Sequence, residues 1–136
     1  MEKLRVGLIG CGVISDIYLK TCQKFEVIDI VACASLDLEE SRQKAKQYNI
    51  AKVCQPDELI QDPDIDCILN LTIPAVHAEI SMAALEAGKH VYSEKPFATD
   101  LKDGEKILAL AKSKNLFVGN APDTFLGGRL QTCRKI

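Results

Sequence analysis

Apolar and polar positions along the chain follow two alternating patterns. Short continuous apolar runs, typical of strands covered on both faces, alternate with stretches in which apolar residues recur every three or four positions, typical of helices. The expected strands are residues 4–9, 27–33, 51–54, 65–71, 90–94 and 116–119, and the expected helices are residues 13–23, 38–48, 56–61, 75–87 and 101–113. This repeat predicts an α/β fold with a doubly wound parallel sheet in three α/β/α layers.

Composition and charge narrow the class of protein. The 136 residues are enough for one domain, and 47% of them are hydrophobic and 26% charged, as in globular proteins. No apolar run is long enough to span a membrane, and the first residues lack the continuous apolar stretch of a secretion signal, so we expect a cytoplasmic protein. The net charge of -2, with both signs interspersed, argues against nucleic acid as a partner.

The six cysteines do not predict a metal site. They contain no C-x2-C pair, and the chain has two histidines. We therefore expect no metal, and we interpret the cysteines as reduced thiols that act as small hydrophobic residues.

A glycine-rich sequence joins the first expected strand to the first expected helix. Residues 10–15 match G-x-G-x-x-G with serine in place of the third glycine, a pattern typical of a Rossmann-type domain. Gly10 would allow a tight turn, Gly12 would let a pyrophosphate approach the backbone, and Ser15 would let the helix pack closely. S-adenosylmethionine is an alternative ligand, but Leu8 stands where its binding proteins commonly have an acidic residue. A turn that serves packing alone is the other alternative.

Two later strand ends carry candidate chemistry. Lys95 lies in a Glu-Lys-Pro sequence at the edge where parallel sheets bind ligands, so it is a candidate for proton transfer, with a solvated surface charge as the alternative. Thr72 is suited to capping a helix or binding a ligand, and Pro74 to the first turn of a helix. His77 has two interpretations of equal weight, a position facing the cofactor cleft and a packing role.

Taken together, these motifs resemble the Gfo/Idh/MocA family of oxidoreductases, named for glucose-fructose oxidoreductase, inositol dehydrogenase and a rhizopine-catabolism protein. The matching motifs are G-x-G-x-x-S at residues 10–15, T-x-P-x-x-H at 72–77, A-L-E-A-G-K-H-V at 84–91 and E-K-P at 94–96. Residues 121–128 resemble the crossover into the second domain of the family. The resemblance implies an NAD(P)-binding domain at residues 1–120, with residues 121–136 beginning a crossover into a substrate-binding domain that is missing.

The resemblance also implies an activity. Family members transfer a hydride between a nicotinamide and a hydroxyl or carbonyl group of a sugar, cyclitol or diol, and Lys95 would assist the proton transfer. The second domain of the family supplies further catalytic groups and the surface for oligomer formation. We therefore expect this chain alone to be inactive and monomeric, and the full-length enzyme to be a homo-oligomer. The alternative is a non-catalytic NAD(P)-sensing module, against which Lys95 argues.

The expected cofactor contacts follow the carboxyl ends of the strands. They are Gly10, Gly12, Val13, Ile14, Ser15, Ser35, Leu71, Thr72, Pro74, His77, Glu94, Lys95 and Asn120. Ser35 stands where enzymes specific for NAD commonly have a carboxylate that binds the ribose 2′-hydroxyl, and the next residue is Leu36 rather than arginine. Asp37 has two interpretations, a ribose contact and a helix cap, of which the cap is the better one. We expect NADP to be modestly preferred over NAD.

Overall fold

Six parallel strands form one sheet in the computed structural model, which describes residues 3–135. The order of the strands across the sheet is β3-β2-β1-β4-β5-β6. The elements are β1 (Leu4–Ile9), α1 (Ser15–Cys22), β2 (Ile28–Ala34), α2 (Leu38–Tyr48), β3 (Lys52–Cys54), α3 (Pro56–Gln61), β4 (Cys67–Asn70), the 3-10 turn η1 (Pro74–Val76), α4 (His77–Glu86), β5 (His90–Ser93), α5 (Leu101–Ser113), β6 (Val118–Asn120), the 3-10 turn η2 (Asp123–Leu126) and α6 (Gly128–Cys133).

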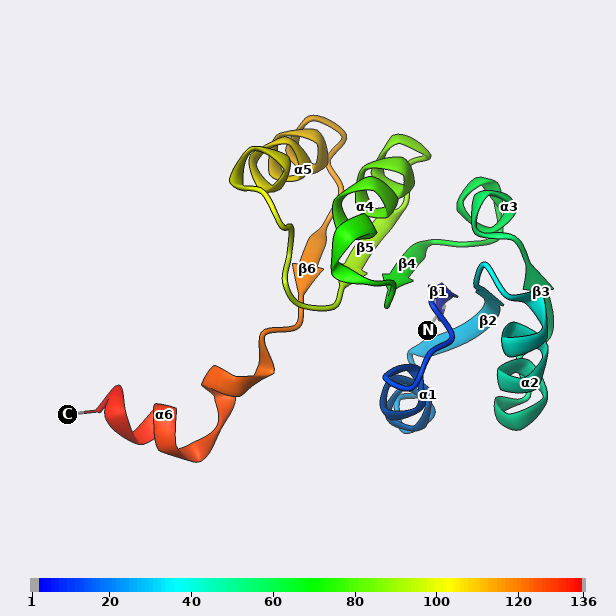
Figure 1. Ribbon diagram of the computed structural model, residues 1–136, viewed down its shortest axis with the longest axis horizontal. Helices are drawn as coiled ribbons and strands as arrows, with labels where there is room; N and C mark the ends of the chain where they lie inside the picture. The colour runs from blue at the N-terminus through cyan, green and yellow to red at the C-terminus, as the bar shows by residue number, and fades with distance from the viewer. Residues whose placement is uncertain (1–2, 136) are drawn as a thin grey trace.

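Helices cover both faces of this sheet, which confirms the doubly wound three-layer fold. Figure 1 shows α1 and α2 on one face and α4 and α5 on the other. The strand β4 explains why the apolar runs do not alternate with polar residues: Ile68 packs into the core that includes residues of α3, α4 and α5, whereas Leu69 packs into the core beside α1 and α2. A strand that is buried on both faces is apolar at successive positions.

The observed elements differ from the sequence prediction mainly at their ends. The last strand begins at Val118 rather than at residue 116. The first residues of the helix expected at 75–87 belong to the separate 3-10 turn η1, and α4 itself begins at His77. Proline at the start of η1 fixes its own φ and lacks an N–H, which suits the first turn of a helix.

One part of the sheet lacks a covering helix. An apolar groove of about 760 Å³ lies over β1, β4, β5 and β6, on the face that carries α1, and Tyr18, Leu69, Tyr92 and Phe117 are among its lining residues. The chain does not fold back over this groove after β6, because η2 and α6 extend away from the sheet (Figure 1).

Three further features concern the described residues. Their cysteines are all free, with Cys133 exposed and Cys11, Cys33, Cys54 and Cys67 buried. Across residues 3–135 there is no group of three or more His, Cys, Asp or Glu side chains that could hold a metal ion. None of the helices in this range is long and apolar enough to cross a membrane.

Candidate cofactor-binding site

The sequence-predicted residues come together along one edge of the sheet. The strand register aligns Ala34 of β2, Ile9 of β1, Asn70 of β4, Ser93 of β5 and Asn120 of β6 side by side. Each strand is parallel to its neighbour, so the segments that follow these positions all leave the sheet at the same edge. The glycine turn, Ser35, residues 71–77 and the Glu-Lys-Pro segment therefore share this edge, where ligands bind in open parallel sheets.

Gly10 is required by the backbone itself. Its φ of +102° lies in the left-handed region, and a Cβ added there would lie 2.5 Å from the backbone oxygen of Leu71. Leu71 is buried, and its N–H donates to the carbonyl of Ile9 at 2.8 Å. Gly10 thus lets the end of β1 pass directly against the end of β4, which confirms that it makes the tight turn.

Gly12 has a different environment. A Cβ added to it would meet nothing within 4 Å, so this part of the turn opens to solvent. Ser15 closes the turn from inside, because its buried hydroxyl donates to the carbonyl of Gly12 at 2.6 Å. The N–H groups of Gly12, Val13 and Ile14 have no acceptor among the described residues. Free N–H groups at the start of a helix are well suited to binding phosphate oxygens.

Apolar side chains project into solvent along the same edge. Val13 is 91% exposed, Leu36 at the end of β2 is 93% exposed, and Ile14 and Ile73 are also exposed. Leu36 and Ile73 come from two other strand ends, so the exposed apolar groups flank the open turn. Exposed apolar groups beside free N–H groups suit a ligand that combines an apolar part with a phosphate group, as a nucleotide does.

Ser35 is turned into the protein. Its hydroxyl lies 2.5 Å from the carbonyl oxygen of Asp37 and 2.7 Å from the hydroxyl of Ser41, and the residue is buried. Asp37 caps α2, since its Oδ1 accepts a hydrogen bond from the N–H of Glu39 at 2.8 Å, as the sequence favoured. The side chain that points outward after β2 is therefore Leu36, which sequence reasoning did not include in the site.

A buried polar network fixes the end of β4. Asn70 is fully buried; its Oδ1 accepts from the hydroxyl of Thr72 at 2.6 Å, and its Nδ2 donates to the carbonyl of His77 at 3.0 Å. His77 is 1% exposed, and its Nδ1 and Nε2 lie 2.7 and 2.8 Å from the backbone oxygens of Pro96 and Thr72. This geometry supports the packing interpretation of His77, because both ring nitrogens contact the backbone of the loops after β4 and β5.

The Glu-Lys-Pro segment follows β5. The side chain of Lys95 extends into solvent, and no described residue accepts a hydrogen bond from its ammonium. Its backbone N–H donates to Oε2 of Glu94 at 2.7 Å, and the Lys95–Pro96 peptide is cis. Asn120 faces this segment from β6 and donates from Nδ2 to the carbonyls of Ser93 and Glu94 at 3.0 and 2.9 Å.

Tyr18, which was not among the site residues expected from the sequence, hydrogen-bonds to Glu94. The hydroxyl of Tyr18, on α1, donates to Oε1 of Glu94 at 2.8 Å. Burial, together with this hydrogen bond to a carboxylate, raises the pKa of the Tyr18 phenol above its usual value. The hydroxyl of Tyr18 therefore stays protonated and donates a hydrogen bond to Glu94.

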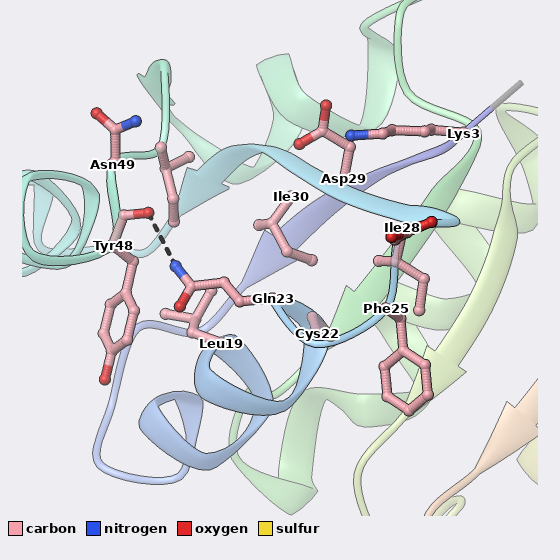
Figure 2. Close-up of a pocket in the computed structure, with 12 residues that line it drawn as sticks. Lys3, Leu19, Cys22, Gln23, Phe25, Ile28, Asp29, Ile30, Tyr48 and Asn49 are labelled. Carbon is pink, nitrogen blue, oxygen red and sulfur yellow. Dashed lines mark hydrogen bonds between the residues drawn. The ribbon is translucent and has the colours of Figure 1, made fainter.

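A second hollow lies away from this edge. A cavity of about 320 Å³ lies between the ends of α1 and α2 and the beginning of β2. Figure 2 shows the residues that line it, with Gln23 donating to the carbonyl of Tyr48. The cavity is located at the amino ends of the strands and includes none of the sequence-predicted site residues. We therefore take the opposite, carboxyl edge as the functional site.

The strand order, the glycine turn and the open edge together define a nucleotide-binding Rossmann domain. The oxidoreductase family with an NAD-binding Rossmann fold matches residues 4–121 of the chain. The chain belongs to this family, the Gfo/Idh/MocA family, as its motifs predicted.

Known proteins that are similar to the chain are oxidoreductases. The chain is 32% identical over 118 residues to trans-1,2-dihydrobenzene-1,2-diol dehydrogenase of Xenopus tropicalis, a match that covers 85% of this chain and 36% of the relative. It is 29% identical over 119 residues to myo-inositol 2-dehydrogenase of Thermotoga maritima, with 85% and 36% covered. The chain thus spans about a third of the length of these relatives.

Solved structures show the same fold with cofactor. Biliverdin reductase from Synechocystis sp. PCC 6803, in complex with biliverdin and NADP+, has a TM-score of 0.90 at 30% identity, covering 97% of this chain and 42% of that one. A 3-ketoreductase from Actinomadura kijaniata, in complex with TDP-benzene and NADP, has a TM-score of 0.87 at 28% identity, covering 98% and 41%.

Proposed function

We propose that this chain is the cofactor-binding part of an NAD(P)-dependent oxidoreductase that acts on a hydroxyl or carbonyl group of a sugar, cyclitol or diol. Residues 1–120 form the cofactor domain in this proposal, and residues 121–136 lead toward the substrate-binding domain. The observation that carries it is the open glycine turn, where three free N–H groups and the unfilled space at Gly12 lie beside exposed apolar side chains. The diol and inositol dehydrogenases among the relatives support the class of substrate.

In this proposal, different residues at the carboxyl edge of the sheet bind the cofactor and transfer the proton. The N–H groups of the glycine turn bind the pyrophosphate, and Val13, Ile14, Leu36 and Ile73 contact the apolar parts of the cofactor. When bound, the nicotinamide supplies the hydride acceptor or donor. Lys95, whose ammonium extends from the end of β5, exchanges a proton with the reacting oxygen of the substrate.

The choice of dinucleotide depends on the end of β2. The side chain that points outward directly after Ser35 is the uncharged Leu36, and the exposed carboxylate of Asp37 is held at the start of α2 by its cap bond to the N–H of Glu39. We therefore propose that NADP is accepted and modestly preferred, with NAD close behind. NADP in the two similar structures is consistent with this proposal. We also infer a cytoplasmic location, because free buried thiols suit a reducing compartment.

Cofactor titration of the chain tests the proposal. We expect NADH and NADPH to bind the wild-type chain, and we expect Gly12→Val to weaken both by about a hundredfold, because its side chain fills the space for the pyrophosphate. The matched control is Gly128→Val, at a glycine that also has nothing within 4 Å of an added Cβ but lies in α6. Equal affinities of the wild type and Gly12→Val, measured by calorimetry, would contradict the proposed phosphate site.

The alternative is an NAD(P)-sensing module with no catalytic step. Lys95 favours the enzyme, because a sensor needs no proton donor at the substrate side of the cofactor. In a longer form of the protein that includes a substrate-binding domain, the enzyme hypothesis predicts turnover, and Lys95→Ala should lower kcat by about a hundredfold or more with nearly unchanged cofactor affinity. A sensor would bind cofactor equally well in both forms and show no turnover in either.

A further inference from the structure

A single carboxylate connects the helix of the glycine turn to the segment that carries Lys95. Tyr18 lies one turn into α1, and its hydroxyl donates to Oε1 of Glu94 at 2.8 Å. The second oxygen of Glu94 accepts a hydrogen bond from the backbone N–H of Lys95 at 2.7 Å. Because β4 lies between β1 and β5 in the sheet, this connection spans the region between the phosphate turn and the end of β5.

The Glu94 carboxylate is one of several groups that hold the backbone on either side of Lys95, together with Asn70, which accepts from the N–H of Glu94 at 2.9 Å, and His77, which contacts the carbonyl of Pro96. The side chain of Lys95 itself has no partner among the described residues, so its location is set by the backbone on which it is carried. That backbone is held on the β6 side by Asn120, which donates to the carbonyls of Ser93 and Glu94. On the α1 side it is held by Tyr18 through the side chain of Glu94. Hydrogen bonds to a charged group are among the stronger ones in proteins.

We propose that Tyr18 is a positioning residue that, through Glu94, fixes Lys95 and the nicotinamide end of the site relative to the glycine turn. This inference rests on the proposed function. The same helix then performs two tasks: its first N–H groups bind the pyrophosphate, and a side chain one turn later sets the distance to the end of β5. Loss of the hydroxyl leaves the phosphate turn intact but loosens the segment that meets the nicotinamide.

A second tyrosine provides a matched control. The hydroxyl of Tyr48 donates to Oδ1 of Asp16 at 2.8 Å, so it also bonds a carboxylate, here one in the first turn of α1. Tyr48 ends α2, however, and this bond joins α1 to α2 on the side of the sheet away from β5. The substitutions Tyr18→Phe and Tyr48→Phe therefore remove the same group from the same kind of bond, but only Tyr18→Phe acts on the Lys95 segment.

The test compares a ligand that has a nicotinamide with one that lacks it. The wild type and both variants are titrated with NADH and with ADP, which carries the adenosine and pyrophosphate alone. We expect Tyr18→Phe to weaken NADH binding about five- to tenfold while ADP affinity changes by less than about twofold. Tyr48→Phe should change neither affinity by more than about twofold. Unchanged ADP affinity also shows that the variant is folded.

A double variant tests whether Tyr18 acts through Glu94. In a Glu94→Ala chain, adding Tyr18→Phe should cause no further loss of NADH affinity, because the partner of the hydroxyl is already absent. Equal NADH affinity of wild type and Tyr18→Phe, an equal loss for NADH and ADP, or additive losses in the double variant would each overturn the inference while leaving the proposed function intact. A wild-type chain that bound neither ligand would overturn the proposed function and the inference with it.

Discussion

Substitutions of the two glycines of the phosphate turn should have different effects: Gly10→Ala should lower the stability of the fold, whereas Gly12→Ala should lower cofactor affinity. Gly10→Ala places a Cβ 2.5 Å from the oxygen and 2.6 Å from the carbon of the Leu71 carbonyl, at a φ of +102° that L residues rarely adopt. The backbone conformation costs about 1–2 kcal/mol, and the displacement of β4 against β1 costs a further 1–3 kcal/mol, roughly. We therefore expect the free energy of unfolding to fall by about 3 kcal/mol. At Gly12, by contrast, an added Cβ meets nothing within 4 Å.

Urea denaturation followed by circular dichroism measures this difference. Gly10→Ala should lower the midpoint and shift the thermal transition by roughly 10 °C. Gly12→Ala should remain within about 0.5 kcal/mol of the wild type, because it touches no other residue. Its effect should appear in cofactor affinity instead. A Gly10→Ala variant as stable as Gly12→Ala would refute the assignment of Gly10 to the contact between β1 and β4.

Two other predictions concern charge. Arg5 holds the pKa of Asp66 below its usual value through side-chain and backbone hydrogen bonds that join the beginnings of β1 and β4. A carboxylate with a lowered pKa contributes stability that is present above the pKa of the unfolded chain and is lost as pH falls through the folded pKa. Asp66→Asn should therefore destabilise the chain by about 1 kcal/mol at pH 7 and progressively less in acid. Urea titrations at several pH values measure this difference. Leu36→Arg, at the outward position after β2, should tighten NADPH relative to NADH by about tenfold, because arginine binds a phosphate group. Equal changes for the two cofactors in parallel titrations would show that residue 36 does not reach the ribose.

The alternation of strands and helices could be predicted because each element carries its own signal. Continuous apolar runs mark strands with two covered faces, and even the short β3 was expected at the right place. The glycine turn and the Glu-Lys-Pro segment were also expected at the strand ends, since their positions follow from local sequence. The expected start of β6 at residue 116 was two residues too early. Leu116 and Phe117 are apolar but precede the strand, so an apolar run does not by itself fix where a strand begins.

The direction of side chains could not be predicted in the same way. Ser35 lies at the expected strand end, but its hydroxyl turns inward to Ser41, a residue of the following helix. The buried Asn70 had one signal in the sequence, a polar residue at the end of an apolar run, yet its partners Thr72 and His77 are defined by the loop they stabilise. Such contacts depend on how two loops meet, and hydrophobic spacing carries no information about that.

Tyr18 is the clearest case of this limit and the most informative for function. The helical spacing of Tyr18 predicts that its aromatic ring belongs to the apolar face of α1. In the structure the residue does line the apolar groove. Its hydroxyl, however, reaches Glu94, which lies 76 residues later in the chain. The ring of a tyrosine can follow the apolar pattern of a helix while its hydroxyl hydrogen-bonds to a distant residue. The sequence therefore locates the two halves of the site on separate strands, and the distance between them is set by a contact that no local motif encodes.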